Sequence, residues 1–355
     1  MPDFVKIKIN MDDNITRMAI IVGVIIMFIA LYSMFQIARQ QKNCDRIKEY
    51  KGDRTIQPIE NATDKNGEKT FDNTTKLIDV YVKTAYNCCC SGDFNNDYVD
   101  TCALSYCSDQ NVRALHFDIY SLNNRPVIAT SSVKGNSYKE TYNSLDLYST
   151  MDFVKNKFMI NSDPLFLIFC VNSKISTTYE SMYAILVELF GTGNKTGNAI
   201  YLSSDIGNTP LFDLRNKVII CVEAFDKPAF YASSLALITS LDLNGSSKIY
   251  RESDILDLYH SRQTPEIYIP EYPQVLFPNK QKSSNNYDFV TTGVQYGINF
   301  IGMSFQTDDA ILSIYKKGFS NNKSSFILRG DIVTIPITPD LKDYYSIVSF
   351  GTVPT

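Results

Sequence analysis

Apolar residues follow two different patterns along this chain of 355 residues. The first pattern is a single uncharged run, Met18–Ala38, which is bounded by Arg17 and Arg39. A helix of roughly 20 residues, rising about 1.5 Å per residue, is about as long as the hydrocarbon layer of a membrane is thick. The run lacks the Ala-x-Ala site of a cleaved signal peptide and the polar stripe of a buried core helix. We therefore favour a retained transmembrane helix over these two alternatives.

The basic residues around this run predict its orientation, because Lys and Arg gather on the cytoplasmic side of membrane helices. Three of them precede the run, and six follow it: Arg39, Lys42, Arg46, Lys48, Lys51 and Arg54. We therefore expect the large domain on the cytoplasmic side. Residues 1–17 are interpreted as a short polar N-terminus and residues 39–76 as a polar juxtamembrane linker. In so Asn-rich a chain, the Asn-x-Ser/Thr sequons are interpreted as chance: Asn14, Asn61, Asn73, Asn194, Asn244 and Asn322.

The second pattern begins at Leu77, where short apolar segments alternate between the periods of strands and helices. Continuous runs such as LFLIFCV are typical of buried parallel strands. The predicted strands are Val80–Tyr86, Ala114–Tyr120, Val127–Thr130, Leu165–Val171, Lys217–Val222, Leu235–Leu241 and Gly297–Phe305. The predicted helices are Asp100–Cys107, Leu147–Phe158, Tyr179–Phe190 and Asp309–Phe319. Repeating β and α units over this length favour an α/β fold with a β/α barrel. A doubly wound sheet is the alternative, but no Gly-rich phosphate loop supports it.

One predicted strand carries the most distinctive side chains. In Ala114–Tyr120, apolar residues alternate with His116, Asp118 and Tyr120, which is the period-2 signal of a strand with two unlike faces. An aspartate and a histidine on one strand face are costly if they are buried without partners. The polar face is therefore either solvated or part of the rim of a site at the mouth of the barrel.

Composition narrows the possible functions. The 34 basic residues are balanced by 38 acidic residues, which argues against nucleic acid as a partner. Only His116 and His260 are histidines, so a site that needs three is excluded. The eight cysteines fit no zinc-finger spacing, and we interpret them as reduced structural thiols. A metal site from His116, Cys170 and one member of Cys88–Cys90 is a weaker alternative.

Several segments, taken in order, resemble phosphoinositide-specific phospholipase C. The matching segments are Ala85–Asn87, His116–Asp118, Pro126–Ser131, DPLFLIFCVN, LRNKVIICVE, VLFPNKQKSSNNY and YGINFIGMSFQT followed by SSFILR. This resemblance implies a phospholipase-C-like (β/α)8 TIM barrel over residues 77–330, followed by a C-terminal tail at residues 331–355.

The resemblance also implies where a site would lie and how far it has changed. The two acid–base histidines of the family correspond to Tyr86 and Thr130, and two substrate-phosphate lysines correspond to Cys221 and Glu223. The calcium-ligand positions correspond to Asn87, His116, Asp118 and Cys170, of which Asn87 and Asp118 keep an oxygen ligand for a residual Ca²⁺. The expected pocket is Asn87, His116, Asp118, Thr130, Cys170, Cys221 and Glu223.

The loss of these groups predicts a barrel without the family's catalysis. We expect a membrane-anchored structural or interaction protein that binds the membrane through Met18–Ala38 and binds no nucleic acid. Its Asn-, Ile-, Lys- and Tyr-rich composition resembles phospholipase-C-like proteins of large DNA viruses, which implies a virion membrane component with viral or host protein partners. Two alternatives stay open. One is a divergent phosphoric diester hydrolase that uses His116 and Asp118 as a base, and the other is a lipid-headgroup-binding module.

Overall fold

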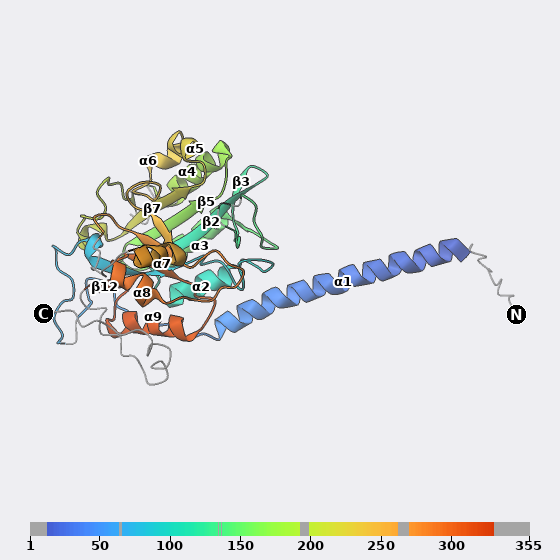
Figure 1. The fold of residues 1–355 in the computed structure, drawn as a ribbon, viewed down its shortest axis with the longest axis horizontal. Helices are drawn as coiled ribbons and strands as arrows, with labels where there is room; N and C mark the ends of the chain where they lie inside the picture. Colours follow the sequence, from blue (N-terminus) through green and yellow to red (C-terminus); the bar gives the residue numbers. More distant parts are fainter. Residues whose placement is uncertain are drawn as a thin grey trace.

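The computed structural model describes residues 13–63, 66–133, 135, 137–191, 199–261 and 270–329. Eight parallel strands form the centre of the domain (Figure 1): β1 (Val80–Ala85), β2 (Ala114–Leu122), β5 (Leu165–Val171), β7 (Lys217–Ala224), β8 (Leu241–Asp242), β9 (Ile249–Arg251), β10 (Val275–Phe277) and β11 (Phe300–Met303). They pair in the order β8-β7-β5-β2-β1-β11-β10-β9. The predicted C-terminal tail at residues 331–355 and the sequon at Asn194 lie outside the described residues.

Four further strands extend this sheet. The strand β3 (Arg125–Ile128) runs antiparallel to β2 and to β4 (Leu145–Asp146), so the segment predicted at Val127–Thr130 belongs to a hairpin rather than to the parallel series. The strand β12 (Phe326–Leu328) is antiparallel to β1, and β6 (Ala199–Ile200) pairs beside the start of β7.

Helices follow most of the parallel strands. They are α2 (Thr101–Asp109), α3 (Leu147–Phe158), α4 (Ser176–Phe190), α5 (Lys227–Tyr231), α6 (Ser234–Leu237), α7 (Glu252–Ser261), α8 (Phe289–Thr292) and α9 (Ala310–Asn321). Short 3-10 turns lie at Leu77–Asp79, Leu211–Leu214 and Val294–Tyr296. The segment Leu235–Leu241, predicted as a strand, is instead α6 followed by the two-residue strand β8, because a short apolar run has no period that separates a helix from a strand.

The sheet has an outer and an inner apolar face. On β2, Leu115, Phe117 and Ile119 belong to the outer cluster, which also contains the buried residues of the helices. The inner cluster contains Phe166 of β5 and Phe300 of β11, whose ring centroids are 5.0 Å apart, although these strands lie in opposite halves of the sheet. The sheet is therefore curled around its own side chains. Since no α-helical residue of the described chain belongs to the inner cluster, the doubly wound alternative does not fit.

The curled sheet has one open seam. Among the described residues, no ladder joins β8 to β9, whereas β1 pairs with both β2 and β11. The strands at the seam have two and three residues, so they offer few backbone groups for pairing. The architecture is thus a mixed α/β fold with an open, barrel-like parallel sheet, and a fully closed TIM barrel is not seen.

The N-terminal helix α1 (Asp13–Lys48) is a single long rod that projects from the domain (Figure 1). Its apolar part is exposed, and by length and composition it can cross a membrane. The helix continues well past Ala38, and its final turns pack beside α2, where Cys44 and Ile47 are buried. The segment predicted as a linker therefore begins as helix. Further along, Ile59 and Phe71 join the inner cluster.

One cysteine pair corrects the expectation that all the thiols are reduced. Cys44 of α1 and Cys102 of α2 form a disulfide, with sulfur atoms 2.03 Å apart. The other six cysteines are free and buried. Among them, Cys88–Cys90 follow β1 in a turn rather than an extended strand, which explains how all three are buried together.

Candidate functional site

The candidate site is built from two rows of inward-facing side chains on adjacent strands. The register pairs Asp118 of β2 with Cys170 of β5, and Cys170 with Glu223 of β7. One layer deeper, His116 pairs with Ile168, and Ile168 pairs with Cys221. His116 and Asp118 are fully buried. Their strand face is therefore not solvated, which was one of the two alternatives that the alternating sequence pattern allowed. Cys170 and Glu223 lie near the C-terminal ends of β5 and β7, where parallel barrels gather their functional groups, and the His116 row lies deeper, within the strands.

Asn87 fixes the protonation of His116. It follows β1 with a left-handed backbone (φ 44°), a conformation that Asn tolerates better than most residues. This turn directs its backbone N–H to Nδ1 of His116 at 3.1 Å, so Nδ1 accepts. A neutral imidazole with Nδ1 as acceptor carries its proton on Nε2. Nε2 lies 3.1 Å from Sγ of Cys170 and 3.7 Å from Oδ1 of Asp118.

The electrostatics of this group oppose acid–base or nucleophilic chemistry. Burial lowers the pKa of His116 to about 3, against the attraction of Asp118. Burial raises the pKa of the Cys170 thiol well above its usual value, and the nearby carboxylates of Glu223 and Asp118 raise it further. A reactive cysteine needs a lowered pKa and a base that accepts its proton. Here Nε2 already holds a proton, so Cys170 and His116 are both neutral.

A buried lysine neutralises Asp118. Nζ of Lys280, from the loop after β10, donates to Oδ2 of Asp118 at 2.5 Å, and Nδ2 of Asn87 donates to the same oxygen at 3.3 Å. Burial alone would raise the pKa of Asp118, but Lys280, His116 and Arg251 together outweigh it and the pKa is lowered. The converse holds for Lys280: burial opposes its charge, but Asp118 and Tyr86 together outweigh burial, so its pKa is raised.

A buried arginine completes the charge balance. Nη1 of Arg251, at the end of β9, donates to Oη of Tyr86 at 3.3 Å and to the carbonyl of Pro278 at 3.2 Å. Burial lowers its pKa, but Tyr86, Cys170, Glu223 and Asp118 raise it by more. Two cations, Arg251 and Lys280, thus face two carboxylates, those of Asp118 and Glu223. The cluster has no excess charge with which to attract an ionic ligand.

Tyr86 fills the space beside His116. Its ring stacks on the imidazole with centroids 4.8 Å apart, and it lies 4.8 Å from the ring of Phe277 on β10, two strands from β1 in the sheet. Nζ of Lys280 and the guanidinium of Arg251 lie near the same ring, at 5.9 and 5.5 Å from its centroid. Tyr86 is fully buried. The position that the resemblance assigns to an acid–base histidine therefore holds a packed aromatic ring.

Two expected pocket residues lie apart from this cluster. Oγ1 of Thr130, which follows β3, donates to the carbonyl of Phe94 at 2.8 Å. Cys221 lies in the deeper row, where its thiol is fully buried and burial raises its pKa. The other expected residues are linked by short contacts, since Sγ of Cys170 also lies 3.3 Å from Oε2 of Glu223.

The residues present do not fit calcium. Calcium needs six to eight oxygen ligands in proteins. Oδ1 of Asn87 is buried and has no hydrogen-bond partner among the described residues, which would suit a cation. However, His116 and Cys170 offer nitrogen and sulfur, and the Lys280 ammonium already occupies an oxygen of Asp118.

Neither cation of the site was predicted from the sequence. Arg251 ends a three-residue strand whose period is too short to detect, and Lys280 follows a short apolar segment in FPNKQK. The signal that could have found Lys280 is its place directly after a buried strand, where parallel barrels position functional side chains.

Comparison with known proteins supports the fold alone. No family model and no curated protein matches the chain. The crystal structures of PLC21 from L. pealei and from S. officinalis each match with a TM-score of 0.57 and 14% sequence identity, and each match covers 77% of this chain and 39% of that protein. A calcium-dependent phosphoinositol-specific phospholipase C from Pseudomonas sp matches with a TM-score of 0.45 and 13% identity, over 73% of this chain and 98% of that one. The chain has a phospholipase-C-like fold and spans well under half of the PLC21 proteins.

Proposed function

We propose that this protein has a phospholipase-C-like fold that no longer hydrolyses phosphodiesters. It acts instead as a membrane-anchored structural or interaction protein. The observation that carries the proposal is the contact between Nζ of Lys280 and Oδ2 of Asp118 at 2.5 Å, beneath the stacked ring of Tyr86. A side chain of the protein itself supplies the cation at this carboxylate. The site is filled and neutral rather than open and charged.

The chemistry supports the same conclusion. Each missing acid–base group costs a factor of about 10² to 10⁴ in rate. Tyr86 and Thr130 stand at both acid–base positions, and the one nearby imidazole, His116, is held neutral and shielded from solvent. Glu223 repels a phosphate, Lys280 is engaged by the Asp118 carboxylate, and Arg251 donates to Tyr86 and Pro278.

The helix α1 supports the membrane-anchored part of the proposal. Its apolar part is exposed rather than packed in the core, and the helix runs without a break into the segment that packs against α2. Both features favour retention in a membrane over cleavage as a signal peptide. Attachment to a virion membrane, and binding to viral or host proteins, are part of the proposal and rest on the sequence resemblance. A closed eight-stranded barrel, as in the family, is also part of the proposal and also rests on the sequence resemblance.

A direct assay tests the proposal. The full-length chain in detergent is incubated with phosphatidylinositol vesicles, with Ca²⁺ or with a chelator, beside an active phosphoinositide-specific phospholipase C. We expect no release of inositol phosphate and no effect of His116→Ala. Turnover that disappears in His116→Ala or Asp118→Ala would support the divergent hydrolase instead. Binding of inositol phosphate without turnover, lost in Arg251→Met, would support the headgroup-binding module.

A matched pair of variants tests the internal cation. Lys280→Met leaves Asp118 buried without its charge partner, which costs roughly 3–5 kcal/mol of folding stability. Lys282→Met, two residues further on and exposed, removes the same charge from the surface and should cost little. Both are compared by thermal unfolding with and without Ca²⁺. A wild-type protein that Ca²⁺ stabilises, or equal losses in both variants, would contradict the role of Lys280.

A further inference from the structure

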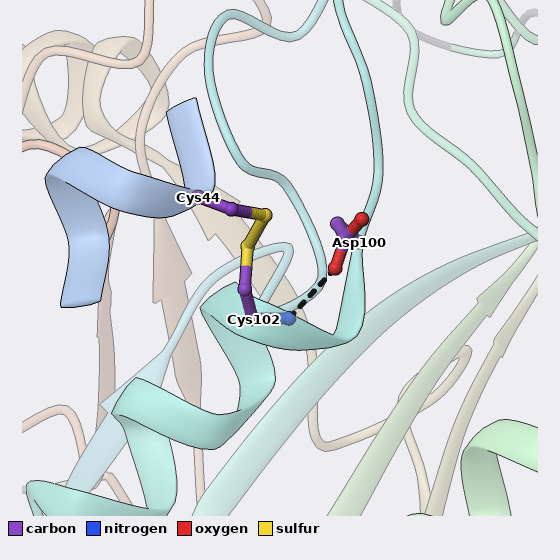
Figure 2. A group of neighbouring side chains, drawn as sticks. All are labelled: Cys44, Asp100 and Cys102. Atoms are coloured by element: carbon purple, nitrogen blue, oxygen red, sulfur yellow. Dashed lines mark hydrogen bonds between the residues drawn. A yellow bond between two sulfur atoms is a disulfide. The ribbon is translucent and has the colours of Figure 1, made fainter. Parts of the chain in front are cut away.

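The disulfide joins the anchor helix to the domain. Cys44 lies in α1, in the turns that follow the apolar run, and Cys102 lies in the first turn of α2 (Figure 2). Oδ1 of Asp100 caps α2 by accepting from the backbone N–H of Cys102 at 2.9 Å. The cap fixes the start of α2, and therefore the position from which Cys102 meets Cys44.

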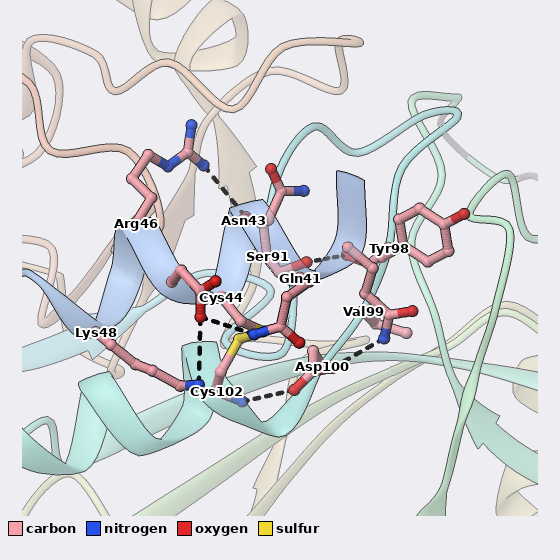
Figure 3. The surroundings of a disulfide bond; sticks show 12 residues. Gln41, Asn43, Cys44, Arg46, Lys48, Ser91, Tyr98, Val99, Asp100 and Cys102 are labelled. Carbon is pink, nitrogen blue, oxygen red and sulfur yellow. Dashed lines mark hydrogen bonds and ion pairs between the residues drawn. A yellow bond between two sulfur atoms is a disulfide. The ribbon is translucent and has the colours of Figure 1, made fainter. Parts of the chain in front are cut away.

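Polar contacts on both sides hold α1 in the position that the disulfide needs. Nη2 of Arg39 and Nδ2 of Asn43 both donate to the buried carboxylate of Asp97, at 2.7 and 2.9 Å. Nε2 of Gln40 donates to Asp100 at 2.9 Å. Around the disulfide, Arg46 donates to the carbonyl of Ser91 at 3.3 Å (Figure 3). The two cysteines are therefore brought together by a built interface rather than by a chance approach.

This pairing bears on the compartment of the domain. Disulfides persist in oxidising compartments, whereas the cytosol keeps thiols reduced. Two of the basic residues that predicted a cytoplasmic domain contact the domain: Arg39 pairs with Asp97, and Arg46 donates to the carbonyl of Ser91. The number of basic residues after the apolar run is thus explained in part by the docking of α1.

We propose that the domain lies on the oxidising, non-cytosolic side of the membrane, with Cys44–Cys102 formed and with Asn61 and Asn73 as glycan acceptors. Both asparagines are exposed, and both belong to the segment between α1 and the first strand. The sequons Asn61-Ala62-Thr63 and Asn73-Thr74-Thr75 are then modification sites rather than chance matches.

Each step needs a co-reactant of that compartment. In disulfide formation, the two thiols lose two protons and two electrons, and the disulfide of a thiol oxidoreductase is reduced to a dithiol. In glycosylation, the amide nitrogen of asparagine bonds to the anomeric carbon of a lipid-linked oligosaccharide. The sugar–pyrophosphate bond breaks, the lipid pyrophosphate leaves, and the amide loses one proton.

The thiol count tests the disulfide. The full-length chain is expressed in cells with an endoplasmic reticulum, quenched in acid, denatured and alkylated with a polyethylene glycol maleimide. We expect six adducts without reductant and all eight after reduction. Cys44→Ser and Cys102→Ser should each give seven adducts under both conditions. Eight adducts without reductant would overturn the proposal. The proposal would also be overturned if a zinc chelator, rather than a reductant, made Cys44 and Cys102 available for alkylation, because the two thiols would then hold a metal ion with Asp100.

Glycosidase treatment tests the side of the membrane on the same samples. We expect a mobility shift that is reduced by Thr63→Ala and retained by the conservative Thr63→Ser, with the same contrast for Thr75→Ala and Thr75→Ser. A chain with no glycan would overturn the proposed orientation. Digestion of the domain by a protease added to the cytosolic side, while the membrane stays intact, would overturn it as well.

Discussion

At the scale of single residues, His116 shows how burial sets chemistry. It is fully buried beside Asp118, yet it stays neutral because burial outweighs the attraction of the carboxylate. Nδ1 is held by the backbone of Asn87, and Nε2 faces the Cys170 thiol. The ring therefore acts as a packed, hydrogen-bonded core residue. Its usual role as a proton carrier near neutral pH is lost.

This state of His116 predicts a pH dependence of stability. The unfolded chain binds a proton below a pKa of 6.5, whereas the folded chain does so only below about 3. Folding stability should therefore fall as the pH drops from 6.5 towards 3, by up to about 1.4 kcal/mol per pH unit. Denaturant unfolding at several pH values measures this slope. His116→Gln, which keeps an acceptor for Asn87, should have a shallower slope, and equal slopes would contradict the assignment.

The polar face of β2 could be predicted from sequence, but its partners could not. Alternation in Ala114–Tyr120 placed His116 and Asp118 together on one face but left open whether that face was solvated, and in the structure both side chains are buried on the inner face. Arg251 and Lys280 reach the same point from the far wall of the sheet. Such a contact depends on the curvature of the whole sheet. The hydrophobic pattern of a single segment does not indicate that curvature.

At the scale of elements, long and strongly patterned segments were predictable, and short ones were not. Leu165–Val171 and Leu147–Phe158 have the predicted bounds. The strands β8, β9 and β10 have two or three residues each, and they are positioned by tertiary pairing rather than by their own apolar period. The seam of the sheet lies between two of these strands, so its openness could not be predicted either.

The helix α9 provides an element-scale prediction. Oδ1 of Asp309 caps the helix by accepting from the N–H of Leu312 at 2.8 Å, and Oδ2 accepts from the backbone and side chain of Asn286 at 3.1 Å. Asp309→Ala should cost roughly 1–2 kcal/mol in thermal or denaturant unfolding. Its neighbour Asp308 forms only a surface ion pair with Lys316, so Asp308→Ala should cost less than about 1 kcal/mol. The reverse ranking would refute the capping role.

At the scale of the whole molecule, the segment after the apolar run of α1 is part of the folded domain. Ile47, Ile59 and Phe71 are each at most 2% exposed. Burying three such side chains contributes roughly 5–9 kcal/mol, which is comparable to the net stability of a typical domain. A linker would contribute nothing of this kind. The sequence could not reveal this role, because these apolar residues are isolated among polar ones.

Truncation measures that contribution. A chain that begins at Arg39, refolded under oxidising conditions, should be soluble without detergent and should unfold cooperatively. A chain that begins at Leu77 lacks Cys44 and the three buried side chains, and it should aggregate or unfold without cooperativity. Circular dichroism during heating distinguishes the two cases. If the shorter chain were as stable as the longer one, residues 39–76 would be a linker after all.

The unbroken course of α1 has a geometric consequence. An α-helix turns by about 100° and rises about 1.5 Å for each residue. Because the helix reaches Cys44 without a break, the number of residues between Ala38 and Cys44 sets the rotational orientation of the domain around the helix axis. In the proposed membrane-anchored protein, any tilt of α1 would likewise be passed to the domain. The domain thus moves with the helix as one unit, and the rotation of the helix at Cys44 determines which face of the domain is turned to its surroundings.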